Sequence, residues 1–188
     1  MALAIVTPPA LEPVSLAEAK QDARIYVNDD DPIVAAYLIA GRQYAEDYTG
    51  RRFVTQTWDY FADQFPGCTI ELPIGPIQSV TSVKYTDSSG IEQTLIEGTD
   101  YDVDNRSLVT RIRPTYAKRW PIVRHQTMNA ISIRVVAGYG SNPGDTPEQI
   151  RQAIKLHVQS YYEADPAKVK LIEDARDNLL RPLRVVYA

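Results

Sequence analysis

Two histidines, one cysteine and a row of aspartates are the residues of this 188-residue chain whose chemistry could serve a reaction or bind a metal. His125 lies in an aromatic and basic segment, and His157 lies in an apolar helical pattern that is typical of a core or interface residue. Neither has a second histidine four residues away, so the sequence lacks a helical zinc pair. Cys68 follows a Pro-Gly turn without a basic neighbour, and a single cysteine excludes an internal disulfide and a cysteine-based zinc site.

Asp100, Asp102 and Asp104 alternate as residues on one face of a strand do. Such a row could bind a cation, but a solvated face of an edge strand is the stronger interpretation. The sequence has no G-x-S-x-G motif for a serine nucleophile, and glycosidase-type acid pairs leave no local signature, so they stay open. We therefore predict no catalytic residue, no metal site and no cofactor, and we expect that the chain is not an enzyme.

Composition sets the broad class of protein. Hydrophobic residues make up 44% of the chain, which supports a real core, and the net charge is −4. An acidic balance argues against a dedicated nucleic-acid binder, although an acidic wall would let DNA slide through a channel. No apolar run is long enough to span a membrane, and the N-terminus lacks the charge pattern of a signal peptide. We expect a protein made and assembled in a cytoplasm, without a membrane partner.

The strongest helix signals lie in residues 146–164, TPEQIRQAIKLHVQSYYEA. Thr146 is expected to cap this helix and Pro147 to occupy its first position. Apolar residues then recur every three to four positions and form one stripe, so we expect the other helices to pack against this one. Helices are also predicted from the Ser15-Leu16-Ala17-Glu18 capping box to about Arg24 or Ile25, from Pro32 to about Thr49 with Gly50 as C-cap, and from Pro166 to Arg181. The proline-rich residues 1–14 are either a frayed terminus or an arm laid on a neighbouring subunit.

Between residues 53 and 137 the pattern changes to the alternation that is typical of strands. The predicted strands are 53–62, 69–72, 79–85, 92–96, 101–103, 108–112 and 130–137. Their spacing predicts an antiparallel meander or a small sandwich. The fold class is therefore α+β, a helical core with an inserted antiparallel β domain. The expected divisions are residues 1–52 (arm and two helices), 53–137 (β domain) and 138–188 (C-terminal helices and tail).

The order of short motifs along most of residues 14–164 resembles the head–tail connector (adaptor) family of tailed bacteriophages and related gene-transfer particles. The resemblance is to the subgroup with a β insertion between connector helices. The motifs that carry it are Val14-Ser15-Leu16-Ala17-Glu18-Ala19-Lys20, Ala45-Glu46-Asp47-Tyr48-Thr49-Gly50-Arg51, Thr55-Gln56-Thr57-Trp58, Leu72-Pro73, Pro76-Ile77-Gln78-Ser79-Val80, Val83-Lys84-Tyr85 with Asp87 and Gly90, Asp100-Tyr101, Val136-Ala137-Gly138-Tyr139-Gly140 and Pro147-Glu148-Gln149-Ile150-Arg151-Gln152-Ala153-Ile154.

The resemblance implies a structural, non-enzymatic virion protein that forms a ring of about twelve copies. Such a ring lies below the portal in the virion neck, extends the DNA channel and docks tail components, after assembly in the host cytoplasm. The implied partners are further copies of the chain, the portal protein, a downstream stopper or tail-completion protein, and non-specific DNA in the channel.

Two groups of residues are predicted to make these contacts. The ring interface is assigned to Tyr37, Tyr44, Tyr48, His157 and Tyr161. The portal-docking segment is assigned to Pro182, Leu183, Arg184, Val185, Val186 and Tyr187, in a tail that we expect to be poorly ordered until it docks.

Two other functions stay open. One is a neck or tail-completion protein that binds the tail tube. The other is a ligand-binding or hydrolase domain in the β region, with Trp58, Tyr116, Trp120 and the aspartate row as its site.

Overall fold

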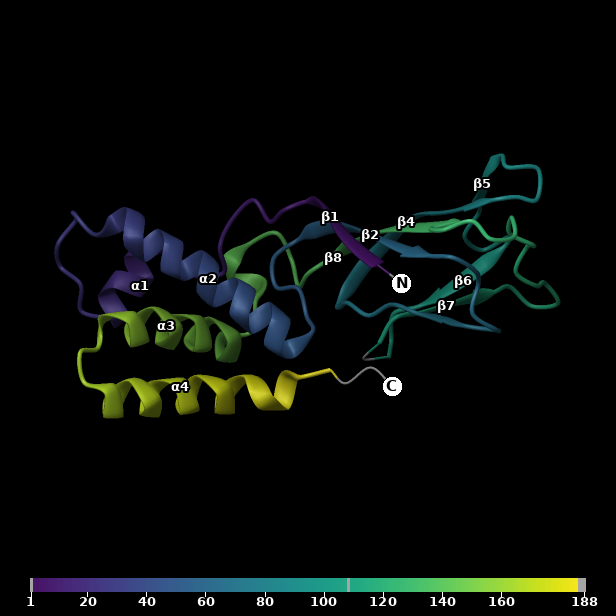
Figure 1. Ribbon diagram of the computed structural model, residues 1–188. Coiled ribbons are helices and arrows are strands. Elements are labelled where there is room, and N and C mark those ends of the chain that lie inside the picture. Colours follow the sequence, from purple (N-terminus) through teal and green to yellow (C-terminus); the bar gives the residue numbers. More distant parts are fainter. Residues whose placement is uncertain (1, 108, 186–188) are drawn as a thin grey trace. The chain divides into compact units, whose positions relative to one another are not determined.

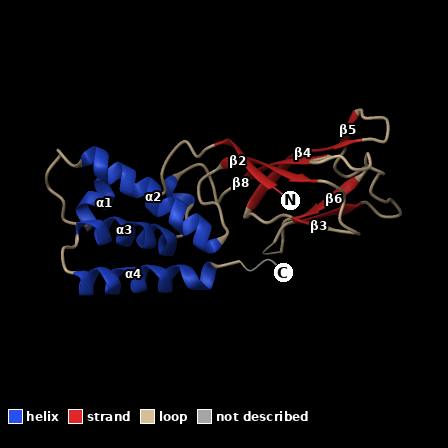
Figure 2. Ribbon diagram, in the orientation of Figure 1, coloured by secondary structure: helices blue, strands red, loops and turns tan. Residues whose placement is uncertain are grey.

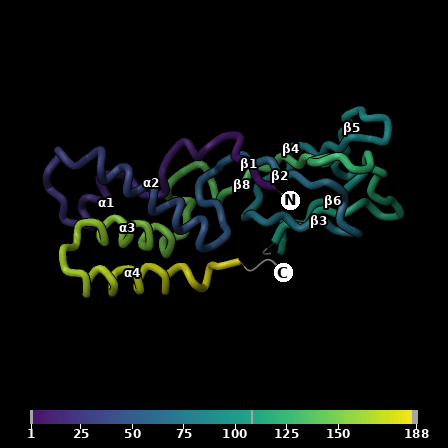
Figure 3. The backbone as a smooth tube through the Cα atoms, viewed as in Figure 1, coloured from purple at the N-terminus to yellow at the C-terminus, as the bar shows by residue number. Residues whose placement is uncertain are grey.

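The structure is a computed structural model and describes residues 2–107 and 109–185. These residues form two units, coloured along the sequence in Figure 1 and by secondary structure in Figure 2. Residues 2–8 and 55–138 form a β unit with all the described strands, and residues 9–54 and 139–185 form a helical unit with all the described helices. The predicted α+β class is confirmed. The backbone passes between the units at residues 8–9, 54–55 and 138–139 (Figure 3).

Local signals explain where the first two helices begin and end. The Ser15 hydroxyl accepts a hydrogen bond from the Glu18 amide at 3.2 Å, and Glu18 Oε2 accepts one from the Ser15 amide at 3.0 Å, which completes the predicted capping box. Gly50 ends the second helix in the left-handed conformation, at φ 70°. The helices and 3₁₀ turns of the unit are α1 (Leu16–Asp22), α2 (Asp31–Thr49), η1 (Pro143–Asp145), α3 (Glu148–Tyr162), α4 (Pro166–Leu180) and η2 (Arg181–Leu183).

The start of α3 differs from the prediction. Thr146 directly follows the preceding 3₁₀ turn as its C-cap residue, and its amide donates to the Pro143 carbonyl at 3.3 Å. Its buried hydroxyl has no hydrogen-bond partner among the described residues. Pro147 takes the cap position instead, and its side chain has no group that can accept a hydrogen bond. The predicted Thr146 cap is therefore wrong, because the turn before the helix already uses this residue.

Within the helical unit, α3 contacts α1, α2 and α4, as its apolar stripe predicts. Each large aliphatic side chain buried there contributes about 1.5–3 kcal/mol relative to an exposed one. Phe53 belongs to this core and not to a strand, since its side chain is fully buried and its amide donates to Glu46 Oε1 at 3.1 Å. None of the described helices combines the length and apolar content that crossing a bilayer requires. The core residues include Val34, Leu38, Ala45, Phe53, Ile150, Ala153, Ile154, Val158 and Leu180.

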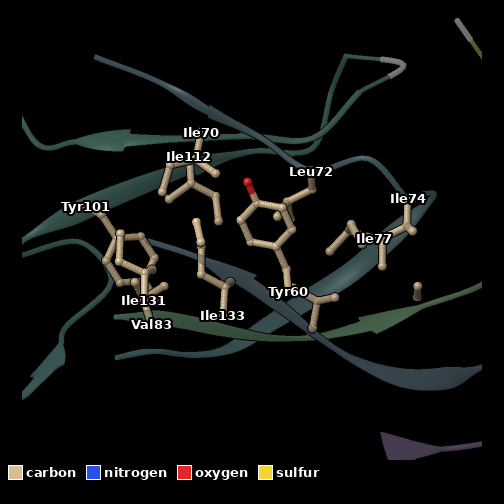
Figure 4. Close-up of a cluster of buried hydrophobic side chains, with 13 residues drawn as sticks. Tyr60, Ile70, Leu72, Ile74, Ile77, Val83, Tyr101, Ile112, Ile131 and Ile133 are labelled. Atoms are coloured by element: carbon tan, nitrogen blue, oxygen red, sulfur yellow. The ribbon is translucent and has the colours of Figure 1, made fainter. Parts of the chain in front are cut away.

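Two antiparallel sheets make the β unit, with strand orders β1-β2-β8-β4-β5 and β3-β7-β6. Side chains of the two sheets point toward each other, as Tyr60 and Ile133 do toward Leu72 and Ile112 in Figure 4. Of the two predicted arrangements, a meander and a small sandwich, the structure has the sandwich. The strands are β1 (Ala2–Thr7), β2 (Gln56–Ala62), β3 (Ile70–Glu71), β4 (Ile77–Thr86), β5 (Glu92–Leu95), β6 (Tyr101–Asp104), β7 (Arg111–Pro114) and β8 (Ile131–Ala137).

The seven predicted strands are present with shifted ends, and β1 is an eighth that the sequence did not predict. It pairs antiparallel with β2, with Ala2 opposite Phe61 and Ile5 opposite Trp58. Residues 2–7 of the N-terminal arm are therefore paired within the chain and not frayed, and residues 2–8 belong to the β unit and not to the helical core. The physical reason is that the prolines begin only at Pro8, so the six residues before it can donate to a sheet.

Candidate functional site

All five residues of the predicted ring interface lie in one aromatic row of the helical unit. Tyr37 stacks on Tyr161 with ring centroids 4.2 Å apart, and Tyr44 stacks on His157 at 5.5 Å. His157 and Tyr161 meet edge to face at 5.3 Å, and Tyr44 and Tyr48 lie 6.1 Å apart. The row forms because the α2 tyrosines recur every seven and four residues, on the side that faces α3.

Two α4 residues, Arg176 and Asp177, complete this row and were missed by the sequence analysis. The Tyr44 hydroxyl donates to Asp177 Oδ1 at 2.8 Å, and Arg176 Nε donates to the same oxygen at 2.9 Å. The Arg176 guanidinium also lies 3.9 Å above the Tyr44 ring and 3.0 Å from His157 Nδ1. A signal existed, because Arg176 falls at helical spacing among Ile172 and Leu179 on the apolar side of α4. We call Tyr44, His157, Arg176 and Asp177 the polar cluster.

The polar cluster holds its histidine neutral. Burial, and to a smaller extent the neighbouring Arg176 cation, lower the pKa of His157 to about 4. Because a guanidinium can only donate, Nδ1 of His157 accepts from Arg176 Nη1, and the ring proton is on Nε2. Burial and the hydrogen bond to Asp177 raise the pKa of Tyr44, so its hydroxyl keeps its proton. The cluster is suited to joining α2, α3 and α4, and neither His157 nor Tyr44 is poised to exchange a proton near neutral pH.

The described part of the predicted docking tail is packed on the helical unit. The Leu183 carbonyl accepts from Arg51 Nε at 2.7 Å, and the Val185 amide donates to the Thr49 carbonyl at 2.9 Å. Val185 is buried, and Arg184 lies 5.8 Å from the Tyr48 ring. The expectation of a poorly ordered tail is therefore wrong for Pro182–Val185, because the end of α2 supplies partners for its backbone. Val186 and Tyr187 lie outside the described residues.

The residues of the alternative ligand site are only partly brought together in the β unit. Asp102, Tyr116 and Trp120 line one cavity of about 840 Å³, together with Cys68. Trp58 is not part of it, and its Nε1 donates to the Gln56 side chain at 2.9 Å. Within the described residues, no group of three or more His, Cys, Asp or Glu side chains could hold a metal ion.

Two of the three residues in the aspartate row, Asp100 and Asp104, are paired with basic side chains. Asp100 Oδ1 accepts from Lys118 Nζ at 2.8 Å, and Asp104 Oδ2 accepts from Arg111 Nη2 at 2.6 Å. These hydrogen bonds lower the pKa of both carboxyls, so both are ionised near neutral pH. A glycosidase-type acid needs the opposite shift, so neither Asp100 nor Asp104 is suited to donate a proton.

Comparison with known proteins finds solved structures that share this fold. No family model and no curated protein matches the sequence. Solved structures do match: a chain in the neck of an empty gene transfer agent (GTA) particle with C6 symmetry (TM-score 0.79), one in the virion of a native GTA particle (0.80) and one in the neck of a native GTA particle with C12 symmetry (0.74). Each match is 22% identical and covers 100% of this chain and 97% of the other. The likeness establishes a shared two-unit fold over the whole chain.

Proposed function

We propose that this chain is a structural protein of the neck of a phage-like particle. The observation that carries the proposal is the match of both units at once, with TM-scores of 0.74 to 0.80, to chains of GTA necks and virions. A match to the helical unit alone would fit many helical proteins, whereas this one includes the β insertion. More specifically, we propose a head–tail connector (adaptor) that forms a ring of about twelve copies, binds the portal and a downstream stopper, and lets DNA pass.

Exposed apolar side chains on the helical unit support a ring. Tyr161, although stacked on Tyr37, is 54% exposed, and Ile33 and Ile39 on α2 are 48% and 42% exposed. A second copy that covers such side chains gains about 25 cal/mol per Å² of apolar area removed from water. We propose that the tyrosines of the aromatic row, Tyr37, Tyr44, Tyr48 and Tyr161, form part of this contact, whereas His157 is buried within the subunit and supports them from beneath. The necks of two matched particles were computed with C6 and C12 symmetry, which agrees with a rotational assembly.

The state of the titratable groups supports a role that is not enzymatic. His157 is neutral and enclosed, and the pKa values of Asp100 and Asp104 are lowered by their basic partners. A binding and assembly role requires none of these groups to transfer a proton. We therefore propose a virion-neck protein without catalytic activity or cofactor.

Negative-stain electron microscopy of the purified protein, alone and with the portal protein of the same particle, tests the proposal. We expect rings attached to portals, and we expect Tyr161→Glu to abolish them while circular dichroism stays unchanged. Leu171→Glu, at a 68% exposed position on α4, is the matched control and should leave rings intact. Binding to the tail tube and not to the portal would favour the tail-completion alternative. A monomer without affinity for either would overturn the proposal.

A further inference from the structure

Positive charge is concentrated in one segment of an otherwise acidic chain. Residues 105–144 contain seven Lys and Arg and no Asp or Glu, whereas the whole chain has a net charge of −4. Three of the seven are neutralised within the β unit: Arg111 pairs with Asp104, Lys118 with Asp100, and Arg134 with Asp59. The remaining arginines of the segment form no ion pair with a described residue, so the segment presents excess positive charge.

Three unneutralised arginines surround one fixed aromatic ring. Trp120 stacks on Phe65 with centroids 4.6 Å apart and planes within 2°, and it lines two adjacent cavities of about 700 and 840 Å³. Arg124 lines the first cavity, and Arg113 and Arg119 line the second. All three are exposed, and none forms an ion pair with a described residue. This surface therefore combines two cavities, an aromatic side chain held in place by stacking, and arginines that lack an ion-pair partner among the described residues.

The same segment also carries three apolar side chains that are almost fully exposed. Tyr116 is 96% exposed, Met128 86% and Ile122 84%. Ile122 and Met128 line the first cavity and Tyr116 lines the second. Burial of each of these side chains by a partner would contribute about 1.5–3 kcal/mol. The loop surface is defined here as Arg113, Tyr116, Arg119, Trp120, Ile122, Arg124 and Met128.

We propose that the loop surface docks a different protein, whose own surface presents carboxylates around an apolar centre. Arg, Tyr, Trp and Met are the residue types enriched at protein interfaces, where Asp and Glu are depleted, and the segment has this composition. Guanidiniums would also serve DNA phosphates. However, Ile122 and Met128 gain nothing from a phosphate backbone, and one face of Trp120 is already covered by Phe65. The inference rests on the proposed function, which makes this partner another protein of the same particle.

Site-specific photo-crosslinking in assembled particles tests the inference. Tyr116→p-benzoylphenylalanine should crosslink to one particle protein other than this chain, identified by mass spectrometry. Arg119→Glu with Arg124→Glu should lower the crosslink yield about tenfold or more, since it reverses two of the three charges. Arg119→Lys with Arg124→Lys should retain most of it. Lys168→Glu with Lys170→Glu, on the exposed side of α4, is the control with the same change in net charge and should not lower the yield.

Three results would overturn the inference: a crosslink to DNA, a crosslink to a second copy of the chain, or no crosslink in particles that contain the protein. A crosslink whose yield does not respond to the charge reversal would overturn it as well. Immunoblotting of purified wild-type particles separates this failure from that of the proposed function. If the protein is absent from particles, both fall, whereas if it is present without a charge-dependent crosslink, only the loop surface is refuted.

Discussion

At the scale of single residues, Arg176 is the cation of the polar cluster and contacts both His157 and the Tyr44 ring. Burial is the main reason that the pKa of His157 is lowered and the ring is neutral, and the Arg176 guanidinium, 3.0 Å from the imidazole, adds to this effect. Burying a cation is costly unless it is paired, and the Asp177 carboxylate supplies the partner. The Tyr44 hydroxyl of α2 donates to that same carboxylate, so a hydrogen bond joins the α4 ion pair to α2. Arg176 also contacts His157 of α3.

The lowered pKa of His157 predicts a pH-dependent stability. The ordinary pKa is 6.5 and the folded value is about 4, so the unfolded chain binds the proton first as the pH falls. The free energy of unfolding should therefore decrease between pH 6.5 and pH 4 and change no further below that for this group. At pH 5 the loss should be about 2 kcal/mol.

Urea unfolding of wild type and His157→Gln at pH 7 and pH 5 measures this contribution. Glutamine does not titrate, so most of the difference between the two pH values should disappear. His125→Gln replaces an exposed histidine and serves as the control that should keep the wild-type dependence. Equal pH dependence in wild type and His157→Gln would contradict the assignment.

At the scale of elements, α2 and α3 approach each other closely at Gly41. A Cβ atom built on Gly41 would lie 3.1 Å from His157 Cδ2 and 3.2 Å from His157 Cβ. The imidazole cannot move away easily, because Tyr44, Tyr161 and Arg176 hold it from other sides. A residue that ordinarily weakens a helix is thus required for helix packing here.

A double-mutant cycle should show this requirement. In the wild-type background, Gly41→Ala should destabilise the protein by about 1–3 kcal/mol through overpacking. In the His157→Gly background, which removes both the Cδ2 and the Cβ contact, the same change should be stabilising by up to about 1 kcal/mol, since only the helix propensity of alanine remains. Denaturant unfolding of the four proteins gives both values. Gly144→Ala, where the added Cβ has no atom within 4 Å, is the control, and a stabilising Gly41→Ala in wild type would refute the steric argument.

At the scale of the whole molecule, the chain end contributes to the helical unit and to the proposed portal contact. Val185 is buried and its amide is hydrogen-bonded to Thr49, so deletion of residues 182–188 removes packing as well as any docking residue. Deletion of residues 186–188 spares this anchor and separates the two roles.

The two deletions should therefore differ in stability but not in portal binding. Deletion of residues 186–188 should abolish portal attachment and leave the free energy of unfolding within about 0.5 kcal/mol of wild type. Deletion of residues 182–188 should also abolish attachment and cost about 1–3 kcal/mol more, for the lost burial of Val185 and Leu183. Co-sedimentation with portal rings and urea unfolding measure the two quantities. Portal attachment by the shorter deletion would restrict docking to residues other than Val186 and Tyr187.

The sequence by itself determined the α+β class, the helices and seven of the strands, because the period of apolar residues and the caps act within a few neighbouring positions. Only the tertiary structure decided which distant segments meet. It placed residues 2–7 beside β2, moved Phe53 into the helical core, brought Arg176 to His157 and gathered Trp120 with Tyr116 and Asp102 around one cavity. Local spacing tells which side of an element is apolar, but the partner of that side depends on packing between residues far apart in the chain.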